Sequence, residues 1–189
     1  YKNDMIEVPM PWGGTSKFAN PDASAEKNRL NRYRLRWMDT KYEPGEVKIV
    51  CYDANGNKAA EKTIRTAGKP HHIELVADRS QLTATPMKDG KVLDTPDLSF
   101  ITVRVVDKDG NLCPDATNQL QFSVKGNAAR FNSCCNGDAT SLEVFTNPTM
   151  RAFHGEVVVV VEATEKSGSA QLVVSSKGLK PASLNISVK

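Results

Sequence analysis

Glutamates are the residues of this chain whose chemistry would be easiest to recognise. Two carboxylates about 5 Å apart can hydrolyse a glycosidic bond, one as acid and base and the other as nucleophile. The glutamates here fall on expected strand faces and turns, and no two share a context that would protonate one and ionise the other. They are Glu7, Glu26, Glu43, Glu46, Glu61, Glu74, Glu143, Glu156, Glu162 and Glu165. We therefore expect no catalytic carboxylate pair.

Serine and histidine offer no clear pattern for nucleophilic or metal-assisted catalysis either. The chain contains no Gly-x-Ser-x-Gly motif, and Ser167-Gly168-Ser169 has the composition of a hairpin loop. His71 and His72 follow a linker proline, which favours a polar strand start over a metal site. We expect no catalytic residue, no metal and no cofactor.

The segment from Asp107 to Asn111 has the composition of a calcium loop. An EF-hand loop carries Gly at its sixth position and Glu at its twelfth, between two helices. Here Gly110 is fourth and the flanking residues predict strands, so a hairpin turn is favoured. A cation site completed by Asp115 or Asp138 is the alternative.

The four cysteines constrain the redox environment only weakly. Cys51 alternates with expected core positions, which predicts a buried free thiol. Cys134 and Cys135 are adjacent, and adjacent cysteines rarely bridge each other. Cys113 could pair with either of them, and the sequence leaves this pairing open.

Aromatic side chains could bind sugars by stacking on a pyranose ring. Trp12 lies in a Pro/Gly loop and is the candidate carbohydrate contact, with packing against its own domain as the favoured alternative. Trp37 alternates with arginines and is expected in the core. Aromatic residues make up only 6% of the chain, too few for a dedicated carbohydrate-binding face.

The composition is that of a globular protein, with 39% hydrophobic and 25% charged residues. A net charge of +3 argues against nucleic-acid binding, and the cluster Arg29, Arg32, Arg34 and Arg36 fits a solvated strand face. The apolar run from Val157 to Val161 is far too short to span a membrane and predicts a strand buried on both faces. We expect neither nucleic-acid binding nor membrane insertion.

Alternating apolar residues and closely spaced turn signals predict an all-β chain without a long helix. Residues 1–31 lack such periodicity and are expected to be irregular. The expected strands cover 32–38, 46–52, 58–66, 72–77, 81–85, 98–106, 119–124, 129–132, 156–163, 169–175 and 182–188.

Two immunoglobulin-like β-sandwich units in tandem are the expected fold, the first of them incomplete. Ala67-Gly-Lys-Pro70 marks the boundary, so the units cover 1–68 and 69–189. A strand that ends in Asp-x-x-Gly-Asn occurs in each unit, at Asp53 and at Asp107. We expect His71, His72 and the loop at Asp107 to contribute to the junction.

The first unit resembles a known accessory domain. A tryptophan strand, Tyr42-Glu-Pro-Gly45, and a Val/Ile strand ending Tyr52-Asp-x-x-Gly-Asn57 are similar to the β-domain behind the catalytic barrel of bacterial family-2 glycoside hydrolases, notably β-galactosidases. The second unit, with Ile73-Glu-Leu and Gly178-Leu-Lys-Pro-Ala182, resembles the invasin/intimin-type immunoglobulin-like module that ends many of these enzymes.

The resemblance implies a non-catalytic C-terminal accessory region of a bacterial glycoside hydrolase that is periplasmic, secreted or on the cell surface. Such a region would act as a spacer or shape an edge of the substrate cleft. Its partners would be the catalytic and other domains of the same polypeptide, with carbohydrate as a further candidate. The alternatives are a module of a bacterial adhesin or surface protein, and a carbohydrate-binding module.

Overall fold

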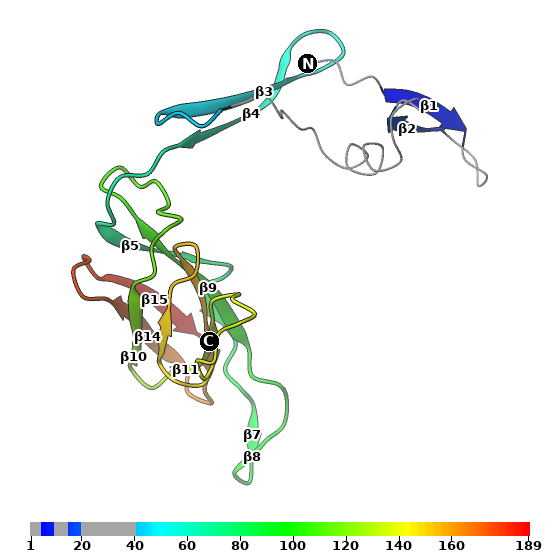
Figure 1. The fold of residues 1–189 in the computed structure, drawn as a ribbon. Coiled ribbons are helices and arrows are strands. Elements are labelled where there is room, and N and C mark those ends of the chain that lie inside the picture. The colour runs from blue at the N-terminus through cyan, green and yellow to red at the C-terminus, as the bar shows by residue number, and fades with distance from the viewer. Residues whose placement is uncertain (1–4, 10–14, 20–40) are drawn as a thin grey trace. The chain divides into compact units, whose positions relative to one another are not determined.

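The computed structural model describes residues 5–9, 15–19 and 41–189, and every regular element in them is a β-strand (Figure 1). This confirms the all-β prediction. The chain divides into two compact units, Tyr1–Pro44 and Gly45–Lys189. The expected strand at 32–38, Trp12, Trp37 and the arginine cluster lie outside the described residues. No helix that could cross a membrane occurs in the described part of the chain.

In the first unit, β1 (Met5–Pro9) and β2 (Thr15–Ala19) form an antiparallel hairpin in which Glu7 lies opposite Lys17. The expectation of an irregular segment was therefore wrong for these residues. The Pro/Gly stretch at 10–14 had been interpreted as loop composition alone. This stretch lies between β1 and β2 in the sequence, and in β1 the apolar residues Ile6 and Val8 alternate with Glu7.

The second unit begins with an antiparallel hairpin of β3 (Glu46–Tyr52) and β4 (Lys58–Arg65), close to the expected bounds. Neither strand contains a buried residue: Val47 is 53% exposed, and Cys51 is exposed rather than buried. The predicted buried face of β3 was therefore wrong within the described structure. Alternation identifies a strand with one apolar face, but burial requires a second layer against that face.

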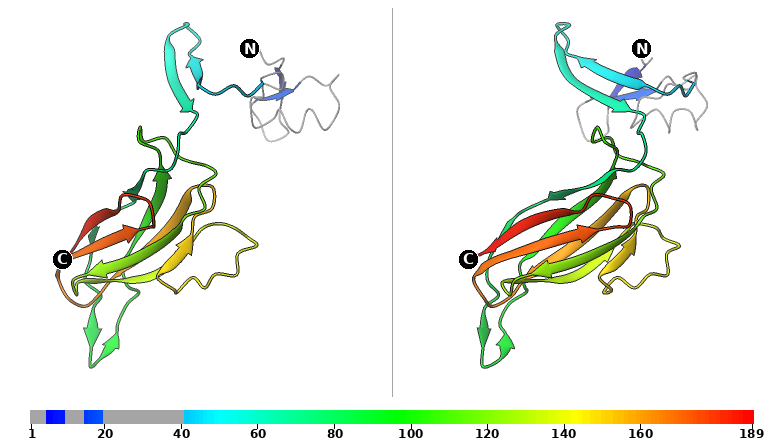
Figure 2. Two further views of the ribbon diagram at one scale, coloured as in Figure 1. Left: turned by 60° about the vertical axis from the view of Figure 1, so that its left-hand side comes forward. Right: turned by 90° about the vertical axis from the view of Figure 1, so that its left-hand side faces the viewer.

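Two larger sheets form the sandwich of this unit (Figure 2). The first has the order β11-β13-β9-β5, and the second has the order β12-β10-β14-β15-β6, in which only the β15–β6 pairing is parallel. The first sheet comprises β11 (Ala129–Cys135), β13 (Glu156–Ala163), β9 (Leu98–Val106) and β5 (His72–Ala77). The second comprises β12 (Thr149–Arg151), β10 (Gln119–Lys125), β14 (Gly168–Ser175), β15 (Ala182–Val188) and β6 (Gln81–Leu82).

The hydrophobic core lies between these two sheets. Ile101, Val103 and Val105 of β9 are fully buried, as their alternation with Phe100, Thr102 and Arg104 predicted. The opposite sheet contributes fully buried residues of β10, β14 and β15 to the same cluster, namely Leu120, Leu172, Val174 and Ile186. The register of the strands thus places one face of each sheet inward.

The expectation that Val157–Val161 is buried on both faces was wrong. Val157, Val159 and Val161 are in the core, but Val158 is 37% exposed and Val160 only half-buried. β13 is a central strand of an antiparallel sheet, and the outward face of that sheet has no second layer among the described residues of this unit. The sequence of β13 is therefore typical of a strand buried on both faces, whereas the structure buries only one of its faces.

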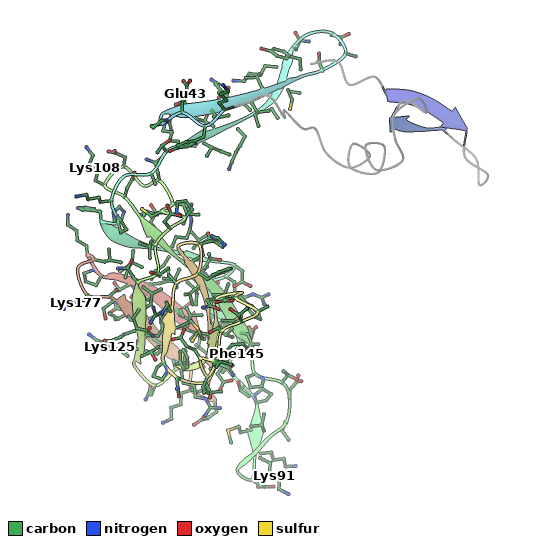
Figure 3. All side chains as sticks on the ribbon, viewed as in Figure 1. Glu43, Lys91, Lys108, Lys125, Phe145 and Lys177 are labelled. Atoms are coloured by element: carbon green, nitrogen blue, oxygen red, sulfur yellow. The ribbon has the colours of Figure 1, made fainter. Side chains whose placement is uncertain are left out.

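In the second unit, three short strands were not predicted, and one strand is much shorter than expected. β12 is one of them, and β6 ends at Leu82 instead of residue 85. The other two, β7 (Met87–Lys88) and β8 (Lys91–Val92), form a small hairpin that projects from the sandwich, with Lys91 near its tip (Figure 3). Its two turn residues have φ values of 50° and 74°, typical of an Asp-Gly hairpin turn.

Candidate functional site at the linker

The linker that enters the sandwich is held by a carboxylate. The backbone N–H of Gly68 donates a hydrogen bond of 2.7 Å to Oδ2 of Asp107, which follows the end of β9. Asp107 is 2% exposed, so this bond is shielded from water. A charged acceptor in such a site makes a stronger hydrogen bond than a neutral one.

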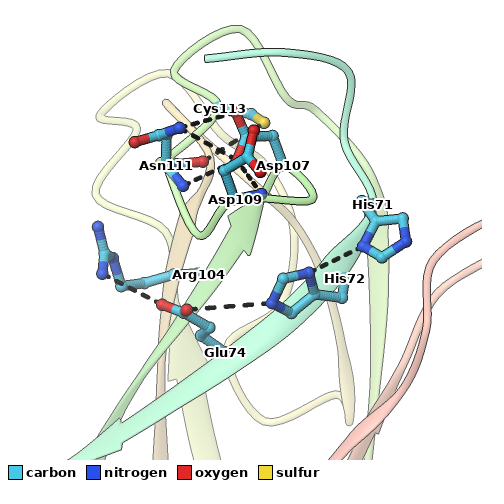
Figure 4. Close-up of polar contacts among 8 residues, drawn as sticks. All are labelled: His71, His72, Glu74, Arg104, Asp107, Asp109, Asn111 and Cys113. Carbon is cyan, nitrogen blue, oxygen red and sulfur yellow. Dashed lines mark hydrogen bonds and ion pairs between the residues drawn. The ribbon is translucent and has the colours of Figure 1, made fainter. Parts of the chain in front are cut away.

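Asp107 also closes its own turn (Figure 4). Its Oδ1 accepts hydrogen bonds of 2.9 Å from the backbone N–H groups of Asp109 and Asn111, and its Oδ2 accepts one of 3.0 Å from Nδ2 of Asn111. The hydrogen bonds from Gly68 and from the Asn111 side chain hold the pKa of Asp107 far below its usual range. The carboxylate is therefore ionised at any physiological pH, and this segment is a hairpin turn, as expected.

The same turn occurs in the β3–β4 hairpin. Oδ1 of Asp53 accepts hydrogen bonds of 2.9 Å from the N–H of Asn55 and 2.8 Å from that of Asn57. Within the described residues, the partners of the Asp53 carboxylate all belong to its own turn. The two aspartates thus have the same local geometry, and Asp107 additionally holds a segment distant in sequence.

Cys113 lies beside this contact. Its Sγ is 3.6 Å from the carbonyl oxygen of Gly68, and burial together with the negative charge of Asp107 raises its thiol pKa. A thiol with a raised pKa and little exposure is a poor nucleophile. Cys113 therefore contributes packing at the linker and no reactivity.

A second set of polar contacts starts at the residue after Pro70. The N–H of His71 donates to the carbonyl oxygen of Val106 (2.8 Å), and its own carbonyl accepts from the N–H of Lys180 (3.1 Å). The Nδ1 atoms of His71 and His72 are 3.0 Å apart, and Nε2 of His72 is 4.0 Å from Oε1 of Glu74. The chain is thus fastened to β9 and to the connection between β14 and β15 as it enters β5.

Arg104 extends this network across the sheet. Its guanidinium lies 3.3 Å from Oε2 of Glu74 and 3.4 Å from Oε1 of Glu156. The register of the first sheet places these three residues side by side, which sequence reasoning missed because the pairing of β5, β9 and β13 was unknown. The two glutamates are bridged by a cation on an open sheet face. This arrangement suits an ion-paired surface better than an acid and a nucleophile.

The other sequence-based candidates are not brought together here. Asp138 accepts hydrogen bonds from the N–H and hydroxyl of Thr140, in a turn of its own. All four cysteines are free, so the open pairing of Cys113 is not formed. In the described part of the chain, no group of three or more histidine, cysteine or acidic residues could hold a metal ion. Trp12 lies outside the described residues, and its carbohydrate contact stays a prediction.

The sandwich has a recognisable relationship to known proteins. Residues 73–185 match the family model described as the glycoside hydrolase family 2 C-terminal domain 5. This chain belongs to that family. Residues 18–60 match a second family model, described as a domain of unknown function (DUF4982), which includes β3 and the start of β4.

Individual relatives agree with this assignment. The chain is 40% identical to the β-galactosidase BoGH2A of Bacteroides ovatus over 189 residues, which is all of this chain and 20% of that protein. A solved structure of a glycosyl hydrolase family 2 member from Bacteroides cellulosilyticus superposes with a TM-score of 0.70 at 28% identity. That match covers 98% of this chain and 22% of the other.

A β-glycosidase structure from Bacteroides vulgatus gives a TM-score of 0.69 at 28% identity, covering 78% of this chain and 18% of that one. The chain thus spans about a fifth of the length of these relatives, and it corresponds to a C-terminal part of them. The immunoglobulin-like ending of invasin/intimin type stays a prediction.

Proposed function

We propose that this chain is a non-catalytic accessory region of a bacterial family-2 glycoside hydrolase resembling β-galactosidase, and that its sandwich holds the preceding domain in place. The observation that carries the proposal is the hydrogen bond from Gly68 to the buried Asp107. A linker tied by its backbone to the sandwich would fix the direction in which the preceding chain leaves the sandwich. A flexible linker would not.

The surroundings of Asp107 support a positioning role over a chemical one. The five hydrogen bonds that its carboxylate accepts come from backbone or amide N–H groups of Gly68, Asp109 and Asn111, which leaves little capacity for a substrate. Pro70 restricts the backbone two residues further on, and it biases Lys69 toward extended conformations. Together these features favour a fixed exit of the chain from the linker into β5.

Asp107→Asn in the full-length enzyme tests the proposal, with Asp53→Asn as the matched control. An asparagine can keep Oδ1 on its own turn, but its amide nitrogen then faces the N–H of Gly68 as a second donor. We expect Asp107→Asn to broaden the small-angle scattering profile and Asp53→Asn to leave it unchanged. Identical profiles for both variants and the wild type would remove the positioning role.

The non-catalytic part of the proposal has a separate test. The purified 189-residue chain should not hydrolyse an aryl galactoside, because the glutamates brought together at Arg104 lie bridged by its positive charge. Turnover that survives purification and is lost on changing a single glutamate would overturn it.

The proposal includes a periplasmic, secreted or cell-surface location for the enzyme, in keeping with the resemblance of the second unit to exported modules. Fractionation of the native host with an antibody to this chain tests the location directly. An adhesin module and a carbohydrate-binding module are the rival functions. A glycan array with the full-length protein and a Trp12→Ala variant would detect the second.

A further inference from the structure

The outward face of the first sheet carries a group of apolar side chains. The register places Val76 of β5 and Val158 of β13 on either side of Thr102, in one row across the sheet. In the next row Phe100 lies opposite Val160. Directly opposed residues on neighbouring strands have Cβ atoms about 5 Å apart, so these side chains form one continuous surface. We call Val76, Phe100, Val158 and Val160 the Val158 face.

This surface is open to solvent in the described structure. Val76 is 53% exposed, Phe100 47% and Val158 37%. The second sheet of the same sandwich differs: the outward positions of β10, β14 and β15 carry glutamine, serine, asparagine and lysine, with Val173 as the apolar residue among them. One sheet therefore has the polar outward face of a solvated antiparallel sheet, and the other does not.

The sequence of β13 also indicates that this outward face is covered. Val157 to Val161 is a continuous apolar run, the pattern of a strand covered on both faces, and only one face is covered here. We propose that the Val158 face docks against another domain of the same polypeptide, one that presents an apolar and weakly charged surface. The inference rests on the proposed function, because it takes the chain as one part of a longer family-2 enzyme.

Charged residues border the face on both sides and define what fits it. Glu74, Arg104 and Glu156 form one border, and Arg130 with Glu162 forms the other. Arg130 and Glu162 neutralise each other, whereas Arg104 is shared by two glutamates, so the first border keeps one excess negative charge and neither border offers a strong charge to a partner. An apolar centre between satisfied polar borders is the usual build of a protein interface.

The size of the face selects a domain of the same polypeptide over a second copy. An aromatic side chain buries about 150–250 Å², so the exposed part of Phe100 contributes on the order of 100 Å² and each valine contributes less. A stable complex between free molecules needs about 800 Å² per partner. A domain on the same chain needs much less, because tethering supplies a high effective concentration. The relatives, of which this chain is about a fifth, contain such further chain.

Cys135 allows the docking to be measured without any activity assay. It is an exposed free thiol opposite Val158 in the register of β11 and β13. In the full-length enzyme, a docked domain should protect it from a maleimide, with the modified peptide quantified by mass spectrometry. Cys51, which lies on β3 in a different sheet, is the internal reference thiol.

Val158→Lys should expose Cys135, because burying an unpaired ammonium in an apolar contact is unfavourable. We expect its labelling rate to rise roughly tenfold or more, the change that follows when a closed contact opens. Val173→Lys, the same change on the outward face of the other sheet, should leave the Cys135 rate unchanged. The Cys51 rate should be equal in all three proteins.

Two results would overturn the proposal. One is a wild-type Cys135 that labels as fast as free glutathione at the same pH, which needs no variant. The other is protection of Cys135 that disappears on dilution of the enzyme, which would assign the face to a second copy. Since no step involves hydrolysis, activity of the isolated 189-residue chain would refute the proposed function and leave this result standing.

Discussion

The β3–β4 hairpin and the sandwich contain the same turn and differ in almost everything around it. Asp53 and Asp107 each close an Asp-x-x-Gly-Asn turn with hydrogen bonds of similar length from the following backbone. Asp53 is exposed, on a hairpin without a buried residue, whereas Asp107 is buried and also holds Gly68. The local sequence specifies a turn in both places, but only long-range packing makes one of them a structural anchor.

Truncation of an apolar side chain should give the largest difference in stability loss between the two regions. Leu172 is fully buried in the sandwich core, so Leu172→Ala should lower its free energy of unfolding by about 2–5 kcal/mol. Val47→Ala in the exposed hairpin should change it by no more than about 0.5 kcal/mol. Urea unfolding of the 189-residue chain measures both. A loss for Val47→Ala as large as that for Leu172→Ala would mean that the hairpin shares the sandwich core.

Replacing a turn glycine by alanine should give a smaller difference in stability loss between the two regions. Gly155 has φ of 78°, and a Cβ there would lie 2.4 Å from the carbonyl oxygen of Cys113. Gly56 has φ of 84° in the hairpin turn, with nothing within 4 Å of a Cβ. Gly155→Ala should cost roughly 2–4 kcal/mol, since backbone strain and a steric clash combine.

The matching change Gly56→Ala should cost about 1–2 kcal/mol, from the left-handed conformation alone, and it should be confined to the hairpin. Thermal unfolding of both variants, with amide exchange to locate the effect, distinguishes the two. If Gly155→Ala and Gly56→Ala lowered the free energy of unfolding equally, the crowding at Gly155 would be relieved without cost.

Asp107 and Asp53 should also differ, by a smaller amount, in how they affect the pH dependence of sandwich stability. The pKa of Asp107 is lowered in the folded state, so its contribution is complete above the unfolded-chain pKa of about 4 and is lost as the pH falls below that value. Below about pH 4 the sandwich of the wild type should therefore lose more stability than that of Asp107→Asn, because asparagine does not titrate.

Asp53→Asn is the control for this measurement. The pKa of Asp53 is also lowered, first of all by hydrogen bonding from the backbone of Asn57, but that interaction stabilises a hairpin outside the sandwich core. The loss of sandwich stability below about pH 4 should thus be the same in Asp53→Asn and in the wild type. If Asp107→Asn and the wild type lost the same stability below about pH 4, Gly68 would not stabilise the ionised carboxylate.

Much of the fold follows from the sequence because strands leave a local signal. β3, β5 and β9 begin and end where alternating apolar residues meet turns that contain Gly, Asp or Pro. β12, β7 and β8 are two or three residues long, too short to show a period of two. β1 and β2 were missed because the Pro/Gly composition between them was interpreted as a loop and not as a hairpin connection.

Burial and the candidate site could be predicted only in part, since both depend on contacts between distant residues. The turn at Asp107 was evident from its five residues, and its hydrogen bond to Gly68 was not, because that bond spans 39 positions. The alternation at Cys51 indicated a core position, and without a second layer the residue is exposed. The run at Val158 indicated two covered faces, and the docking proposed for that face would reconcile the sequence with the structure.

The non-catalytic role is tested most directly by the glutamates that the fold brings together at Arg104. The measurement is kcat/KM for an aryl galactoside with the full-length enzyme carrying Glu74→Gln or Glu156→Gln, with Glu61→Gln of the hairpin as control. We expect all three variants to stay within about threefold of the wild type, far from the 10²–10⁴-fold that a catalytic acid or base contributes. A loss in that range for Glu74→Gln or Glu156→Gln, with Glu61→Gln unaffected, would contradict the account.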